Sequence, residues 1–123
     1  MQAPDHPDSP ISVIDGDGDG STVVFLRGEH DLSGRVALTR VLDEQEGDLV
    51  VDLCECEFID STIIGVLLAQ DRRRKVAGER FEVVAKVDGA VARVLEIVNA
   101  HAVLTLTRRD GSAAPRLAES QGR

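Results

Sequence analysis

The chain has 123 residues, enough for one small domain with a single hydrophobic core and too few for a separate catalytic domain. Fourteen Lys and Arg against 22 Asp and Glu give a formal net charge of −8, which disfavours attraction to nucleic acid or to an anionic membrane surface. Trp and Tyr are absent, so the stacking platforms of a single-stranded nucleic-acid binder are missing as well. The expected partner is therefore another protein.

The two ends of the chain differ in composition from its middle. Residues 1–9 and 108–123 are polar, contain Pro, Gly and Ser, and carry few large apolar side chains, so both are predicted to be disordered tails around a domain at 10–107. The first residues show no basic stretch followed by an apolar one, so no leader sequence is expected. No apolar run approaches the roughly 20 residues that cross a bilayer. We expect a cytoplasmic protein without membrane contact, as a monomer or weak dimer.

A β-hairpin is predicted at the start of the domain. Two β-branched runs, 11–14 and 21–28, flank the hexapeptide DGDGDG, whose Gly residues allow positive φ and whose Asp residues tolerate it. The hexapeptide also resembles the start of an EF-hand calcium loop. However, the closing position, which requires a bidentate Glu, is Leu26, and both flanks have strand character. No metal site is expected.

Helices and strands alternate in the rest of the domain. Helical spacing of apolar residues predicts helices at 33–45 with Ser33 as cap, from Ser61 to Gly78, and from Asp88 as cap to Asn99 as a left-handed end. Further strands are predicted at 48–59, 80–87 and 102–107. The order β β α β α β α β predicts an α/β fold, a mixed sheet of about five strands with helices mainly on one face.

The sequence offers no converging set of catalytic groups. His6, His30 and His101 lack the spacing of a metal site or of a nucleophile and its base, and no Walker loop, dinucleotide-binding glycine pattern or nucleophile elbow occurs. Cys54 and Cys56 are one residue apart on an extended segment, so both thiols are expected on one face, without zinc spacing. We expect a binding protein that uses no cofactor, not an enzyme.

A basic cluster closes the second predicted helix. Arg72, Arg73, Arg74 and Lys75 occupy its last turn, where positive charge opposes the negative end of the helix dipole. We expect these four side chains to be solvated. The alternative is that they bind an acidic partner.

Polar residues gather where strands meet helices, and FIDSTIIG, residues 58–65, is the most informative of these junctions. Asp60, Ser61 and Thr62 stand at a helix start, where side-chain oxygens accept from unpaired N–H groups, and Ser61 is predicted to act as a cap. A phosphate on Ser61 would gain from the helix dipole and add about −1.5 to −2 charges beside Asp60. Both capping and display for modification are open from the residues alone.

Three segments in one register resemble the STAS domains of bacterial anti-sigma factor antagonists: LRGEHDLS at 26–33, VVDLCECEFIDSTIIGVLLAQDRRRKVAG at 50–78 and VARVLEIV at 91–98. The resemblance implies a STAS fold and a protein that binds an anti-sigma factor, usually a serine-protein kinase, and so releases a sigma factor for transcription. It also implies that phosphorylation of Ser61 breaks this complex and that a serine phosphatase restores it.

The same resemblance implies a docking surface. Glu29 and Asp31 would lie in it at one strand-to-helix corner, and Asp60 and Thr62 would lie beside the phosphoacceptor. Ile63 stands where the family has glycine, so a bulky residue is expected at this surface. Two other functions stay open. One is a STAS subunit that is never phosphorylated and serves in a signalling complex or beside a lipid-transport ATPase; the other is a nucleotide or small-molecule sensor that uses the same corner.

Overall fold

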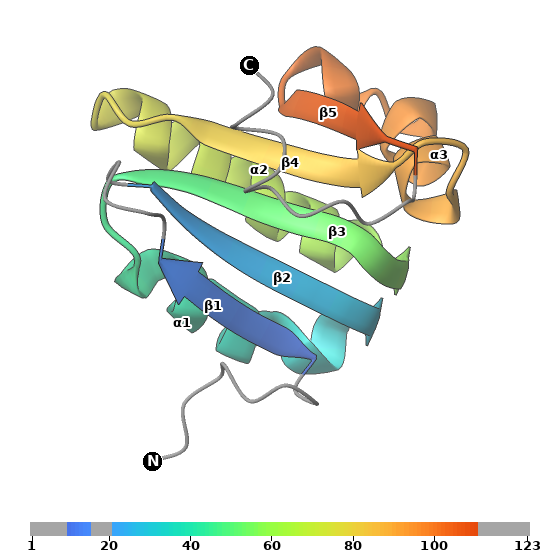
Figure 1. Cartoon of the computed structure of the whole chain (residues 1–123), viewed down its shortest axis with the longest axis horizontal. Helices are drawn as coiled ribbons and strands as arrows, with labels where there is room; N and C mark the ends of the chain where they lie inside the picture. The colour runs from blue at the N-terminus through green and yellow to red at the C-terminus, as the bar shows by residue number, and fades with distance from the viewer. Residues whose placement is uncertain (1–9, 16–20, 111–123) are drawn as a thin grey trace.

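The computed structural model describes residues 10–15 and 21–110, whose strands form one five-stranded sheet (Figure 1). The strands are β1 (Ile11–Asp15), β2 (Ser21–His30), β3 (Asp48–Ile59), β4 (Phe81–Lys86) and β5 (Thr105–Arg109). They lie in sequence order, with β1 antiparallel to β2 and all other neighbours parallel. The predicted hairpin pairing is confirmed. Residues 16–20 of its DGDGDG turn and the predicted tails, except for residues 108–110, lie outside the described residues.

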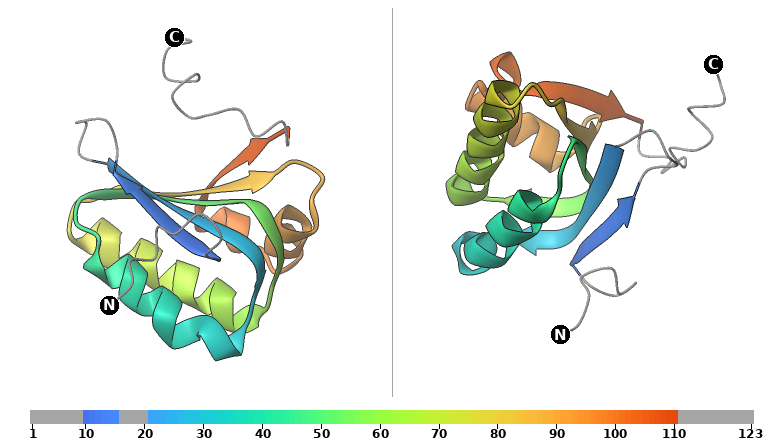
Figure 2. Two further views of the ribbon diagram at one scale, coloured as in Figure 1. Left: turned by 60° about the horizontal axis from the view of Figure 1, so that its bottom comes forward. Right: turned by 90° about the vertical axis from the view of Figure 1, so that its left-hand side faces the viewer.

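The helices are α1 (Arg35–Glu44), α2 (Ser61–Val76) and α3 (Ala90–Ile97), with short 3-10 turns at Leu32–Gly34 and Ala100–Ala102. All three helices lie on the same side of the sheet (Figure 2). Parallel strands added one after another in one direction, with crossovers of the usual right hand, place every connecting helix on that side. The predicted α/β class, with helices mainly on one face, is confirmed. Within the described part of the chain, no helix is long and apolar enough to cross a membrane.

The main core lies between the sheet and the three helices. Alternate residues of β2 and β3 point into it, and the helices contribute their apolar stripes. Its fully buried members include Val24, Leu38, Val51, Leu67 and Leu95. A second, smaller cluster forms on the opposite face of the sheet from Val23, Val50 and Val84, with Phe25 and Cys54 packed beside them.

Two irregularities in β3 decide which way its side chains face. The parallel register with β2 shifts between Phe25 and Arg27 and again between Gly28 and Glu29, each time leaving an extra residue on β3. Cys56 consequently belongs to the main core, whereas Cys54 packs against the cluster on the opposite face. The expectation that both thiols share a face is therefore wrong, because period-two alternation holds only in an unbulged strand.

Two predicted helix caps are also wrong. Helix α1 has Gly34 at its N-cap and no side-chain cap, while Ser33 lies inside the preceding 3-10 turn. At α3, Gly89 N donates to Lys86 O at 3.0 Å, which closes a tight turn with Asp88 at φ 65, so Gly89 takes the N-cap position. The left-handed end at Asn99 is confirmed, with φ 64. The last strand starts later than predicted because a 3-10 turn precedes it, and it runs on to Arg109. Residues 108 and 109 therefore belong to the sheet and not to the predicted tail.

Arg74 is the exception in the basic cluster, because it is buried while its three basic neighbours are exposed. Its guanidinium donates to the carbonyl oxygens of Leu42, Gln45 and Gly47 at 2.7, 2.7 and 2.6 Å, and it pairs with Glu79 at 3.3 Å. These carbonyls belong to the end of α1 and the loop that leads into β3. Burial, the largest cause, lowers the pKa of Arg74. Arg74 therefore ties the C-terminal ends of α1 and α2 together, and its expected solvation is wrong.

Removal of the Arg74 side chain is predicted to destabilise the fold. Arg74→Ala would leave several buried carbonyl groups without donors, so we expect the free energy of unfolding to fall by about 3 kcal/mol in a urea titration. Arg73→Ala is the matched control, because Arg73 is exposed and only pairs with Asp43 at the surface; we expect a loss of at most about 1 kcal/mol. Equal losses for the two variants would contradict the assignment.

Candidate functional site

Asp60 joins the two strand-to-helix junctions that the sequence singles out. It is the N-cap of α2, and its Oδ1 accepts from the N–H of Ile63 at 3.1 Å. Its other oxygen, Oδ2, accepts from the N–H of Leu32 at 3.0 Å, in the turn that follows β2. One carboxylate therefore satisfies a donor at the start of α2 and also holds the neighbouring junction against it.

The second acidic residue of this corner, Asp31, organises the turn before α1. Its Oδ1 accepts from the backbone N–H of Ser33 at 3.0 Å and from the Ser33 hydroxyl at 2.7 Å. These two hydrogen bonds favour the charged form and lower the pKa of Asp31. The structure therefore brings Asp31 and Asp60 to adjacent turns, with Leu32 between them.

Ser61 is the first residue of α2 and is exposed. The prediction that Ser61 caps the helix is wrong, because Asp60 holds that position. Because Asp60 accepts the capping hydrogen bond from Ile63, the Ser61 hydroxyl takes no part in it. Thr62, the next residue, is half-buried and lines a groove of about 460 Å³ between α1 and α2 together with Arg35 and Arg73. The neighbouring hydroxyls of Ser61 and Thr62 thus have different surroundings.

Ile63 lies in the main core and is fully buried, so it adds no side chain to the corner surface. Its expected place in the docking surface is therefore not supported. The turn of a helix explains the difference: Asp60 fixes the start of α2, and the third residue of that helix then points toward the sheet. Gly65, exposed one turn after Ser61, has open space where a Cβ would stand. The Ile63 side chain therefore does not restrict the access of another protein to the Ser61 hydroxyl.

Two exposed apolar side chains complete the corner, and the sequence analysis missed both as site residues. Leu32 is 64% exposed and Phe58 is 47% exposed. Leu32 follows Asp31, and Phe58 pairs in register with the exposed Glu29 at the ends of β3 and β2. The sequence offers a clue to the exposure of each side chain. Leu32 precedes the apolar stripe of α1 and is not part of it. Phe58 lies between acidic Glu57 and buried Ile59. The corner is therefore acidic with an apolar patch.

The neighbouring His30 is buried, and its Nε2 donates to the carbonyl oxygen of Arg27 at 2.9 Å. This bond gives one of the two ring nitrogens a partner within β2 itself. His30 is therefore a structural residue of the strand end, not a group turned toward a ligand.

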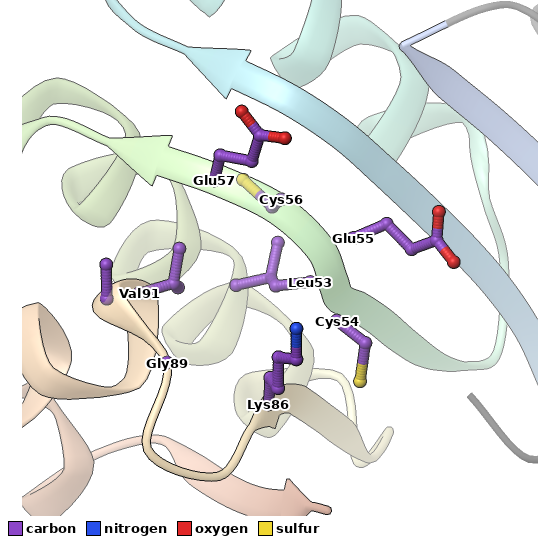
Figure 3. Close-up of a pocket in the computed structure, with 9 residues that line it drawn as sticks. Leu53, Cys54, Glu55, Cys56, Glu57, Lys86, Gly89 and Val91 are labelled. Carbon is purple, nitrogen blue, oxygen red and sulfur yellow. The ribbon is translucent and has the colours of Figure 1, made fainter. Parts of the chain in front are cut away.

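A second pocket, of about 450 Å³, lies where β3 and β4 approach the start of α3 (Figure 3). Cys54 and Cys56 line it, and their side chains leave β3 in different directions. Burial and then the Asp52 carboxylate raise the pKa of Cys54 to about 12, and burial also raises the pKa of Cys56. Both thiols stay protonated at neutral pH, a state that disfavours nucleophilic attack and metal binding. Among residues 10–15 and 21–110, no three His, Cys, Asp or Glu side chains form a group that could hold a metal ion.

This geometry defines a small α/β domain with an acidic and apolar corner around an exposed helix-start serine. Residues 15–106 match the family model described as "Mlab, STAS domain". The chain belongs to the STAS-domain family, as its sequence motifs predict. A search of curated protein sequences finds no significant match.

Three solved structures illustrate the similarity of the fold. An anti-sigma factor antagonist from Mycobacterium paratuberculosis is 26% identical, with 87% of this chain and 90% of that chain covered and a TM-score of 0.65. A putative anti-sigma factor antagonist from Thermotoga maritima is 16% identical, covers 93% and 94%, and has a TM-score of 0.64. The phosphorylated form of the Bacillus cell fate determinant SpoIIAA is 13% identical, covers 92% and 99%, and has a TM-score of 0.63.

The hydrogen bonds from Ser33 predict an acid-shifted titration of Asp31. We expect its pKa, measured from carboxyl carbon shifts by NMR, to lie below 3.8 in the folded protein and to rise in Ser33→Ala. Because the pKa of Asp31 is depressed in the folded protein, its carboxylate stabilises the fold above about pH 3.8. This stabilisation is lost as the pH falls through the pKa of the folded state. An identical titration in both proteins would contradict this account.

The burial of Ile63 predicts a structural role for this side chain. We expect Ile63→Ala to lower the free energy of unfolding by about 3 kcal/mol, since it deletes buried carbon atoms and leaves a cavity. Leu32→Ala, at an exposed apolar position, is expected to change it by no more than about 0.5 kcal/mol. Chemical denaturation measures both, and an Ile63→Ala variant as stable as Leu32→Ala would show that Ile63 is not part of the core.

Proposed function

We propose that this protein is an anti-sigma factor antagonist, a regulatory binding module and not an enzyme. In its unmodified form it binds an anti-sigma factor of the serine-kinase type through the corner around Ser61, and so releases a sigma factor. The observation that carries the proposal is the Asp60 cap, which leaves the Ser61 hydroxyl exposed beside the acidic and apolar corner. The relative from Mycobacterium paratuberculosis, described as an anti-sigma factor antagonist, supports the same class.

The chemistry of the corner sets what the partner must offer. Glu29, Asp31 and Asp60 supply negative charge, while Leu32 and Phe58 supply exposed apolar surface. A complementary partner carries basic side chains around an apolar depression, which speeds association and excludes acidic competitors. Thr62 would contact the partner only at the edge, because it lines the groove between α1 and α2.

Phosphorylation of Ser61 would act as the switch in this proposal. The Ser61 oxygen attacks the γ-phosphorus of ATP held by the kinase, ADP leaves, and the hydroxyl proton is lost to a base of the kinase. The product carries about −1.5 to −2 charges next to Asp60, which repels that carboxylate and alters the docking surface, while the fold remains because Asp60 still caps α2. A serine phosphatase hydrolyses the phosphate and restores the binding form. The protein itself needs no cofactor and touches no nucleic acid.

A constitutive interaction subunit is the second candidate. The family model that matches bears the description Mlab and not that of an antagonist. Family membership therefore leaves open a STAS subunit that is never phosphorylated and serves in a signalling complex or beside a lipid-transport ATPase.

Affinity capture from native cells distinguishes these candidates. Tagged wild-type protein is expected to retain a serine-kinase anti-sigma factor and Ser61→Glu to lose it. Thr105→Glu, a charge control at an exposed hydroxyl residue at the start of β5, away from the corner, is expected to retain it. Incubation of the captured kinase and ATP with the chain should add about 80 Da, the mass of one phosphoryl group, at Ser61. Capture of a transporter ATPase equally by wild type and Ser61→Glu, with no added mass, would refute the switch and favour the constitutive subunit.

A further inference from the structure

The groove between α1 and α2 contains a cation that the described part of the chain does not use. The two helices lie side by side (Figure 2), and Arg35, Asp43, Thr62 and Arg73 are among the residues that line the groove. Arg73 pairs with Asp43, which also accepts a hydrogen bond from Gln70. Arg35 is exposed, and among the described residues its side chain has neither a hydrogen bond nor an ion pair. The uncompensated charge of the groove is therefore positive.

The position of Arg35 is unfavourable for α1 itself. Arg35 is the first residue of this helix, which has no side-chain cap and no acidic residue in its first turn. The unpaired N–H groups at a helix start carry partial positive charge, so a cation at this position destabilises the helix. A residue that opposes its own helix without a compensating contact is typical of a functional position. We therefore look for the role of Arg35 in the binding of a partner.

The groove adjoins the corner around Ser61. On the α2 side, Thr62 directly follows Ser61, and Gly65, one helical turn after Ser61, also lines the groove. On the α1 side, Arg35 comes three residues after Leu32, an exposed apolar side chain of the corner. The corner and the groove therefore form one continuous surface at the starts of α1 and α2.

The acidic charge of the corner does not by itself explain why phosphorylation would release a partner. Its carboxylates favour a basic partner, and a phosphate on Ser61 would add further negative charge, which attracts a basic surface more strongly. Release by charge requires an acidic group of the partner near Ser61. Arg35 offers such a group a counter-ion in the groove beside this serine.

We propose, on the basis of the proposed function, that the anti-sigma partner inserts an Asp or Glu side chain into this groove and that its carboxylate pairs with Arg35. A guanidinium binds a carboxylate through charge-assisted hydrogen bonds, which are stronger than neutral ones. A phosphate on Ser61 then repels the inserted carboxylate, and the complex dissociates. The binding surface of the partner therefore carries two signs of charge, basic opposite the corner and acidic opposite the groove.

Charge reversal at Arg35 tests this contact, with the purified serine-kinase anti-sigma factor that the wild-type chain captures as the probe. We expect Arg35→Glu to raise the Kd, measured by calorimetry, by about tenfold or more, because two carboxylates would then face each other. Arg93→Glu makes the same charge change at an exposed residue of α3, and we expect it to alter the Kd by less than about twofold. Thermal unfolding should show that Arg35→Glu is folded, since an acidic residue suits the first turn of α1.

Obstruction of the groove tests the same contact without a change of charge. Ala69 is exposed and lines the groove two helical turns beyond Ser61, so Ala69→Gln would narrow the groove without touching the corner. We expect this variant to raise the Kd for the kinase by about tenfold. Ala37→Gln places the same side chain at an exposed position of α1 that does not line the groove, and its Kd is expected to stay within about twofold of the wild-type value.

A neutral variant at Ser61 separates charge from bulk. Ser61→Gln has nearly the shape of Ser61→Glu but no charge, so we expect its Kd to be at least about tenfold lower than that of Ser61→Glu. Equal losses for the two variants would show that bulk causes the release and would overturn the charge mechanism.

The remaining outcomes separate this inference from the proposed function. Wild-type affinity in Arg35→Glu and Ala69→Gln, while Ser61→Glu still loses the kinase, would overturn the groove contact and leave the proposed function intact. If the wild-type chain retains no serine-kinase anti-sigma factor, the proposed function is overturned, and the assignment of this partner to the groove is overturned with it.

Discussion

One carboxylate, that of Asp60, holds together the corner that we propose as the docking surface. It caps α2 through Ile63 N and reaches Leu32 N in the turn after β2, so the two junctions that carry the exposed serine and the acidic patch cannot move independently. Arg74 does the corresponding work at the opposite end of the same helix pair, where it binds the last carbonyls of α1. Helices α1 and α2 are therefore tied at both ends by buried or half-buried charged groups, each of which makes more than one hydrogen bond.

The hydrogen bonds of Asp60 and Arg74 explain how a modification at Ser61 would change a surface and leave the fold intact. The capping bond is made by Asp60, and the apolar anchor of the same turn is Ile63, deep in the core. Neither group is Ser61, the proposed phosphoacceptor. A phosphate on Ser61 would therefore add charge outside the hydrogen bonds at the start of α2. It would also repel Asp60, which accepts those hydrogen bonds. The groups that stabilise the start of α2, Asp60 and Ile63, are thus distinct from the proposed modification site.

The strand order has a second consequence for the molecule. Because β2 to β5 are added in order in one direction, all crossover helices cover the same face, and no crossover helix lies on the opposite face. The main core therefore lies on the helix side of the sheet, and Val23, Val50 and Val84 form a smaller apolar cluster on the other side.

Some features of this protein follow from local patterns that the sequence displays directly. Alternating and continuous apolar runs predict the five strands, helical spacing predicts the three helices, and Asn99 predicts the left-handed end of α3, because each depends on neighbours within one turn or one strand. The motif around Ser61 likewise marks the helix start. The caps were harder to predict, since Asp60, Ser61 and Thr62 all suit the position and the choice depends on where the preceding strand ends.

What the local pattern could not determine depends on contacts between distant segments. Arg74 looks like its three exposed neighbours in sequence, and only the carbonyls of Leu42, Gln45 and Gly47 in another element make it a buried residue. The extra residues that β3 carries against β2 turn Cys54 and Cys56 to opposite faces, which alternation along one strand cannot foresee. The sequence by itself therefore determined the elements, the family and the candidate serine. Tertiary structure alone decided which polar groups hold helices together and which remain exposed, because burial and hydrogen bonding depend on the partners that folding brings together.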